Sequence, residues 1–148
     1  MVSLFLILTG LSGCGSSTDK NDEKIINDAI NRSLNKPVSV EVNEATPEEY
    51  PLVKTLSIYP IEERPEDRKV VNITLVGKLT EVAELNLGAN NISDLSPLAG
   101  LNKLTRLDFS LNKVADLKPL EGKNNLIILN AHGNQIKMSI VSVRLWTS

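Results

Sequence analysis

Cysteine and histidine, two residue types that often carry nucleophilic or zinc chemistry, each occur once in this chain of 148 residues, as Cys14 and His132. One residue of each type provides neither the clustered ligands of a zinc site nor a second cysteine for an internal disulfide. The sequence also shows no Gly-rich phosphate loop and no nucleophile–base pair. These observations predict that the protein is not an enzyme and uses no metal and no cofactor.

Cys14 follows a segment that has the features of a leader peptide. Residues 2–11 are uncharged and mostly apolar; they are too short for a bilayer span of about 20 residues but suit the hydrophobic region of a signal peptide. The tetrapeptide Leu11-Ser12-Gly13-Cys14 resembles the bacterial lipobox, although no Lys or Arg precedes the apolar run. The resemblance implies a signal peptide over residues 1–14, a lipidated Cys14, a flexible tether over residues 15–22, and an extracytoplasmic protein anchored in the bacterial cell envelope. The alternative is a buried structural cysteine.

Three asparagines, Asn90, Asn112 and Asn134, recur at one constant spacing, and apolar residues recur with them. The matching columns are Val82, Leu104 and Leu126; Leu85, Leu107 and Leu129; Leu87, Phe109 and Ala131; Ile92, Val114 and Ile136; and Pro97 with Pro119. A fixed period of this length indicates a stacked repeat protein. We interpret the asparagine column as scaffold, because an amide can donate and accept hydrogen bonds to the backbone of a buried turn at once.

Apolar and polar residues alternate in Leu85-Asn86-Leu87, which predicts a short strand with one buried face. After Asn90 the apolar residues are spaced by three, which predicts 3₁₀ or extended turns. The full pattern L-x-x-L-x-L-x-x-N-x-I-x-x-L-x-x-L-x-x-L is similar to the leucine-rich repeat, and Ser96-Pro97-Leu98 resembles the internalin-type repeats of bacterial surface proteins. The resemblance implies an α/β right-handed solenoid. Its parallel strands would form the concave face, its 3₁₀ and irregular segments the convex side, and small helices an N-terminal cap.

The repeats are expected over residues 53–148, as 53–81, 82–103, 104–125 and an incomplete 126–148. The first repeat is longer than the others and would hold an insertion within the charged stretch 60–69. Upstream, residues 23–52 are predicted to form the cap, with Asp19 or Asp22 as the helix N-cap and a capping box at Thr46-Pro47-Glu48-Glu49. The repeat pattern fails abruptly after Ile136, from which we hypothesise a truncated or frame-shifted piece of a longer repeat protein.

Outward strand positions of such a solenoid form one curved sheet, the usual binding face. The candidate ligand-binding residues on it are Glu84, Asn86, Arg106, Asp108, Ile128, Asn130 and His132. Within this set, Ile128 and His132 near Arg106 are the predicted anchor. The expected partner is an unidentified protein or glycan, with membrane contact through the lipid only. A net charge of −2 without a basic run argues against a nucleic-acid footprint, so no nucleic-acid partner is expected. The alternatives are a recognition fragment of a larger secreted enzyme and a truncated, non-functional gene product.

Overall fold

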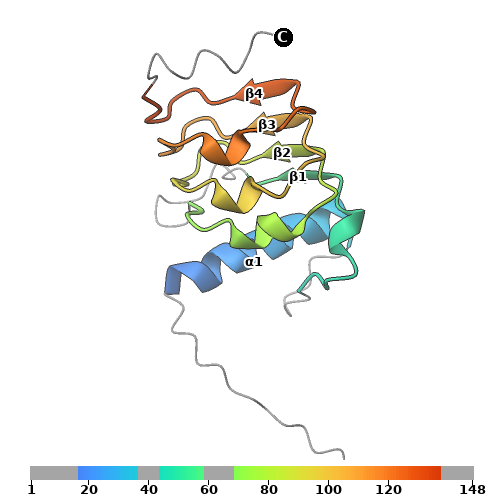
Figure 1. Ribbon diagram of the computed structural model, residues 1–148. Helices are drawn as coiled ribbons and strands as arrows, with labels where there is room; N and C mark the ends of the chain where they lie inside the picture. The colour runs from blue at the N-terminus through green and yellow to red at the C-terminus, as the bar shows by residue number, and fades with distance from the viewer. Residues whose placement is uncertain (1–16, 37–43, 59–68, 138–148) are drawn as a thin grey trace, which may run out of the picture.

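The computed structural model describes residues 17–36, 44–58 and 69–137 (Figure 1). Four short strands pair in chain order into one parallel sheet: β1 (Thr55–Ser57), β2 (Glu84–Asn86), β3 (Arg106–Asp108) and β4 (Ile128–Asn130). After each of the first three strands the chain returns through a 3₁₀ segment on the opposite side of the coil: η3 (Thr74–Lys78), η4 (Ser96–Leu98) and η5 (Lys118–Leu120). The predicted α/β leucine-rich-repeat solenoid is confirmed.

The strand register follows the repeat spacing in the sequence. Leu85 lies opposite Leu107, and Leu107 lies opposite Leu129, one repeat period apart in each case. The opening repeat joins the same column through Leu56, which pairs with Leu85 across a longer stretch of chain than the later repeats span. Leu107 is completely buried, because a coil covers it on each side. The core is therefore a stack of aliphatic layers that neighbouring coils share.

The convex side is built from apolar residues spaced by three. Ile92, Leu95, Leu98 and Leu101 are all buried. A 3₁₀ turn places residues i and i+3 on the same side, and the Leu98 N–H donates to the Leu95 carbonyl at 2.8 Å. The Asp94 carboxylate accepts the backbone N–H of Ser96 at 2.7 Å, which starts η4 where Pro97 removes a donor.

The first coil is covered by α1 (Ser17–Ser33), whose buried side chains include Ile26, Ala29 and Ile30. The helix begins earlier than predicted, so residues 17–22 are helical rather than a tether, and Asp22 is not an N-cap. The reason is a tertiary contact. Asp22 is only 3% exposed, and its Oδ2 accepts the backbone N–H groups of Val71 and Asn72 at 3.1 and 2.8 Å. Docking on the first repeat therefore holds this turn of the helix in place.

The capping-box residues form a turn and not an α-helix. The Thr46 N–H donates to Glu49 Oε2 at 2.9 Å, and the Glu49 N–H donates back to the Thr46 carbonyl at 2.9 Å. The chain then enters the short 3₁₀ segment η1 (Tyr50–Leu52) before β1. An ion pair between Lys36 and Glu49 ties this turn to the residues that follow α1.

Several sequence predictions fall outside the described residues. These are the lipidation site Cys14, most of the insertion expected over residues 60–69, and the chain after Lys137. Within the described part of the chain, no helix is both long enough and apolar enough to cross a membrane.

Candidate binding face

The three recurring asparagines bond to the backbone of two neighbouring coils. Asn112 Oδ1 accepts the Ile92 N–H at 2.9 Å. Its Nδ2 donates to the carbonyl oxygens of Leu87 and Phe109 at 2.9 and 3.0 Å. Asn90 repeats the arrangement one coil earlier, accepting the Val70 N–H at 3.0 Å. The amide donors and the acceptor are thus already bonded within the scaffold, which leaves little capacity for a ligand.

Asn134 makes the same bonds in the last described coil. Its Oδ1 accepts the Val114 N–H at 3.0 Å, and its Nδ2 donates to the carbonyl oxygens of Phe109 and Ala131, each at 3.0 Å. Unlike Asn90 and Asn112, it is only half-buried.

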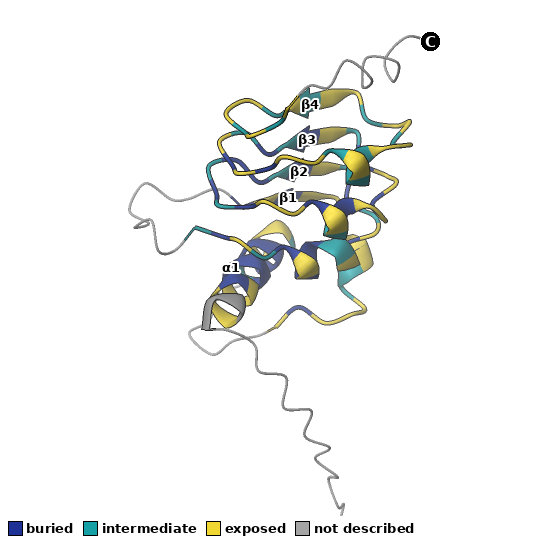
Figure 2. Ribbon diagram, turned by 60° about the vertical axis from the view of Figure 1, so that its left-hand side comes forward, coloured by how far each residue is buried: buried dark blue, intermediate teal, exposed yellow. Residues whose placement is uncertain are grey.

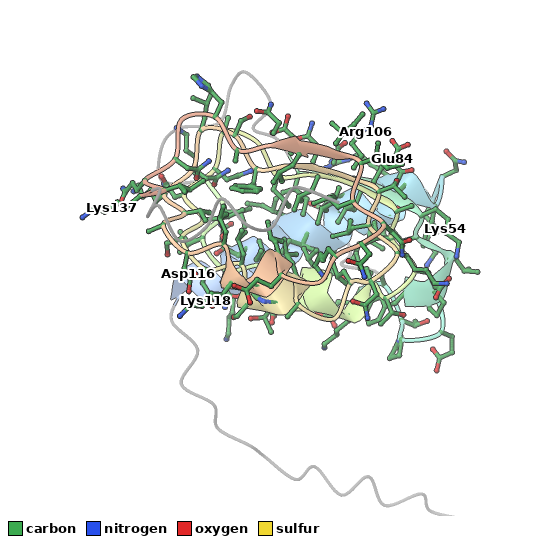
Figure 3. All side chains as sticks on the ribbon, turned by 45° about the horizontal axis from the view of Figure 1, so that its top comes forward. Lys54, Glu84, Arg106, Asp116, Lys118 and Lys137 are labelled. Atoms are coloured by element: carbon green, nitrogen blue, oxygen red, sulfur yellow. The ribbon has the colours of Figure 1, made fainter. Side chains whose placement is uncertain are left out.

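The outward side chains of the four strands form two columns in register. The first column contains Thr55, Glu84, Arg106 and Ile128, all exposed. Figure 3 shows Glu84 and Arg106 side by side on one side of the sheet. Because adjacent parallel strands lie about 4.8 Å apart, one ligand can contact an acid, a guanidinium and an aliphatic side chain together. This column contains the largest apolar side chain of the predicted set, Ile128, which is 44% exposed.

The second column is polar and internally bonded. It consists of Ser57, Asn86, Asp108 and Asn130. Asp108 Oδ1 accepts the hydroxyl and the backbone N–H of Ser110 at 2.7 and 2.8 Å, and Oδ2 accepts from Asn130 Nδ2 at 2.8 Å. Partial burial would raise the pKa of Asp108, but these bonds outweigh it and lower the pKa below its ordinary value. Asp108 is therefore a fixed negative charge at the middle of the face.

The residues of the predicted anchor lie on β3, on β4 and in the turn after β4. Ile128 pairs directly with Arg106. His132 lies beyond the end of β4, where its backbone N–H donates to Asn130 Oδ1 at 3.3 Å and its carbonyl accepts the Leu111 N–H at 2.7 Å. His132 is four residues along the chain from Ile128, in the turn that follows the strand. The histidine is exposed and belongs to the rim of the face.

Two features were missed by sequence reasoning. Leu111 has a positive φ of 55° and is 57% exposed, in a position that Gly133 occupies in the next coil. A hollow of 570 Å³ lies beside β1 and is lined partly by α1. No sequence signal marks the hollow, because its residues come from elements that only the fold brings together. Among the described residues, no cluster of three or more His, Cys, Asp or Glu is arranged to hold a metal ion.

Comparisons with known proteins agree with this architecture. Residues 80–122 match the family described as Leucine Rich repeats (2 copies). A solved internalin (inlF) from Listeria monocytogenes is 28% identical, with a TM-score of 0.67 over 87% of this chain and 36% of its own. This chain therefore spans about a third of that relative's length.

Two further structures are more distant. Internalin C2 from Listeria monocytogenes is 18% identical over 78% of this chain and 76% of its own, with a TM-score of 0.47. The CBM51-2 and INT domains of Clostridium perfringens ZmpB are 24% identical over 59% of this chain and 16% of theirs, with a TM-score of 0.45. A comparison with curated proteins gives no match. The repeat register, the family match over residues 80–122 and the inlF structure together show a leucine-rich-repeat fold that is similar to that of bacterial internalins.

Proposed function

We propose that this protein is a binding module that recognises another protein through its concave face and is held outside the cytoplasm by a lipid on Cys14. The observation that carries the proposal is the register of Glu84, Arg106 and Ile128 on the outward side of adjacent strands. An arginine beside an exposed aliphatic side chain is the combination that often dominates binding energy at protein interfaces.

The neighbouring polar column supports recognition rather than catalysis. Asp108 is ionised and its oxygens are bonded to Ser110 and Asn130, so it is fixed in place and poorly suited to accept a substrate proton. The fixed negative charge of Asp108 beside the positive charge of Arg106 gives the face a defined arrangement of charges. Such patterns give specificity and orientation to a protein partner. We therefore infer a binding role without enzymatic activity.

The face is tested by a charge reversal with a matched control. Arg106→Glu should weaken the affinity for a partner isolated by affinity capture at least about tenfold, because it removes a central contact and adds a second acid beside Glu84. Lys118→Glu makes the same change of charge on an exposed residue of η5, and Figure 3 shows Lys118 on the opposite side of the coil. Calorimetric titration of both variants with the purified partner gives the affinities. Equal affinities for the two variants would exclude the concave face.

The anchor is tested independently of the face. Expression with an alkyne-bearing fatty acid should label the wild-type protein and leave Cys14→Ser unlabelled, with the variant shifting from the membrane to the aqueous fraction. Each buried methylene contributes about 0.8 kcal/mol to membrane affinity, so losing the acyl chains should release the protein. A variant that stays labelled and membrane-bound would contradict lipidation at Cys14.

A further inference from the structure

The hollow beside β1 combines cationic, hydroxyl-bearing and apolar side chains. It is lined by Ala29, Arg32, Ser33, Leu52, Lys54, Thr55 and Ser57. Two of these residues are cationic, three carry hydroxyl groups, and none is acidic. We propose that this hollow binds an acidic saccharide, with Arg32 and Lys54 holding the oxyanion and the hydroxyl groups of the lining holding the sugar. The hollow lies at the N-terminal end of the concave face and shares Thr55 and Ser57 with its two columns, but the proposal does not require Arg106.

The hollow exists because two different elements meet there. The last turn of α1 supplies Arg32 and Ser33, and β1 supplies the outward-facing Thr55 and Ser57. Figure 1 shows α1 running beneath β1 at the end of the coil stack. Leu52, in η1, is 63% exposed and adds an apolar wall. The volume of 570 Å³ falls in the range of about 300–1,000 Å³ that is usual for small-molecule sites.

The end of the helix does not repel an anion strongly. Helix C-termini carry partial negative charge on their last carbonyl groups. Here the carbonyls of Ile30, Asn31 and Arg32 accept the backbone N–H groups of Leu34, Lys36 and Asn35 at 2.9–3.1 Å. Those lone pairs are directed back into the chain, and Arg32 adds a full positive charge at the same place. Its guanidinium fork is suited to bidentate contact with a carboxylate or sulfate.

Lys54 is the weaker of the two cations. Its Nζ lies 3.3 Å from Glu81 Oε2, and the two side chains are 60% and 41% exposed. An ion pair this exposed contributes little to stability, so an incoming oxyanion can take the place of Glu81. Glu84 is another acid near the site, on the strand next to Thr55, and its other neighbour in the column is Arg106. Arg32 is therefore the main anchor, and Glu81 competes with the ligand for Lys54.

The hydroxyl groups favour a ligand that carries hydrogen-bond donors beside its oxyanion, such as an acidic saccharide, over a simple anion. The Ser33 hydroxyl already donates to the Ile30 carbonyl at 2.7 Å, so its oxygen is available only as an acceptor. A carboxylate or sulfate has no donor to offer it, whereas a sugar hydroxyl has one. Thr55 and Ser57 can both donate and accept, as vicinal sugar hydroxyls require. The C–H face of a sugar ring can pack on the exposed Leu52 side chain.

The proposal is tested with four defined probes. NMR titrations of the purified protein would use a heparin-derived tetrasaccharide, a hyaluronan tetrasaccharide, neutral chitotetraose and tetraglutamate. We expect the amide signals of Arg32, Ser33, Thr55 and Ser57 to shift with one or both acidic saccharides. Comparing heparin with hyaluronan distinguishes sulfate from carboxylate as the oxyanion. Chitotetraose and tetraglutamate should each bind at least about tenfold more weakly. Chitotetraose has no oxyanion for Arg32, and tetraglutamate has no sugar ring and no hydroxyl groups.

Three variants locate the site. Arg32→Ala should weaken binding of the acidic saccharide about tenfold, and Glu81→Gln should strengthen it about threefold by releasing Lys54. The control Lys103→Ala removes an exposed cation that does not line the hollow and should bind as the wild type does. Binding of neither acidic saccharide, equal binding of chitotetraose or tetraglutamate, or unchanged affinity in Arg32→Ala would each overturn the proposal.

Discussion

The two ends of the coil stack are built from the same kinds of residue and yet differ in burial. At the N-terminal end, α1 covers the first coil, and Leu56 and Ile58 of that coil are buried. In the last described coil, Leu129 and Ala131 occupy the same columns but are only partly buried. Figure 2 shows this contrast as dark blue around α1 and β1 and as yellow and teal along the coil of β4.

The difference shows that burial in this fold depends on the neighbouring coil and not on the residue itself. Leu107 and Leu129 occupy equivalent positions and pair with one another, yet only Leu107 has a described coil on both sides. The stability of a stacked repeat is approximately a sum of repeat and nearest-neighbour interface contributions. A gradient of local stability from α1 to β4 follows.

The largest expected effect is the loss of a doubly covered leucine. Leu107→Ala should lower the free energy of unfolding by about 2–5 kcal/mol, because it leaves a cavity in a layer that cannot collapse freely. Leu129→Ala should lower it by less than half as much, since its side chain is already partly exposed. Urea denaturation followed by circular dichroism measures both values. Equal losses would contradict a gradient along the stack.

The asparagine column gives a second and smaller contrast. Asn112→Ala removes the acceptor for the Ile92 N–H and the donors to several carbonyl groups, which should cost about 2–3 kcal/mol. Asn134→Ala removes the same kinds of bond at a half-buried site, where water can replace them, so the cost should be about 1 kcal/mol. The same denaturation experiment compares them. A larger loss for Asn134→Ala would argue against solvent access at the last coil.

The docking of the cap is tested at Asp22. Asp22→Ala removes the carboxylate that accepts two backbone N–H groups of the first coil and should cost about 1.5–2 kcal/mol. Glu23→Ala is the matched control, because Glu23 is an exposed acid on the same helix. We expect faster hydrogen exchange at the Val71 and Asn72 amides in the first variant only. Protection that is unchanged in Asp22→Ala would show that the contact does not hold the cap.

The smallest effect concerns the loops after β3 and β4. Leu111 and Gly133 both have positive φ, a region that costs a leucine more than a glycine or asparagine. Leu111→Asn should therefore raise the free energy of unfolding by about 0.5–1 kcal/mol. Gly133→Ala should lower it, because an added Cβ would lie 2.7 Å from Leu111 Cδ2. Thermal denaturation of the two variants should give shifts of opposite sign; a destabilised Leu111→Asn would contradict the strain argument.

The repeats could be predicted from the sequence because their determinants are local and periodic. The constant repeat spacing predicted the pairing of Leu85, Leu107 and Leu129. The first repeat was expected to begin at residue 53, and β1 lies close to that start, with Leu56 in the leucine column, although the first repeat is longer than those that follow. Proline at the start of both η4 and η5 agrees with the irregular return segments expected on the convex side.

The start of α1 and the hollow beside β1 could not be predicted in the same way. Asp22 is buried by a contact with Val71 and Asn72, which lie far along the chain. From the sequence alone, an acid near the start of a helix is equally consistent with an N-cap. Arg32 and Lys54 likewise look like ordinary surface cations until the fold places both on one hollow. The rim position of His132 follows from the end of β4, which the repeat pattern does not define.

Hydrogen exchange of three equivalent amides tests the stacked-coil account most directly. The N–H groups of Val70, Ile92 and Val114 are each accepted by an asparagine of the recurring column, Asn90, Asn112 and Asn134 in turn. The account predicts slow exchange at Val70 and Ile92, with similar opening free energies, and faster exchange at Val114 beside the last described coil. Exchange of all three amides at the rate of an unstructured peptide, or slowest exchange at Val114, would contradict it.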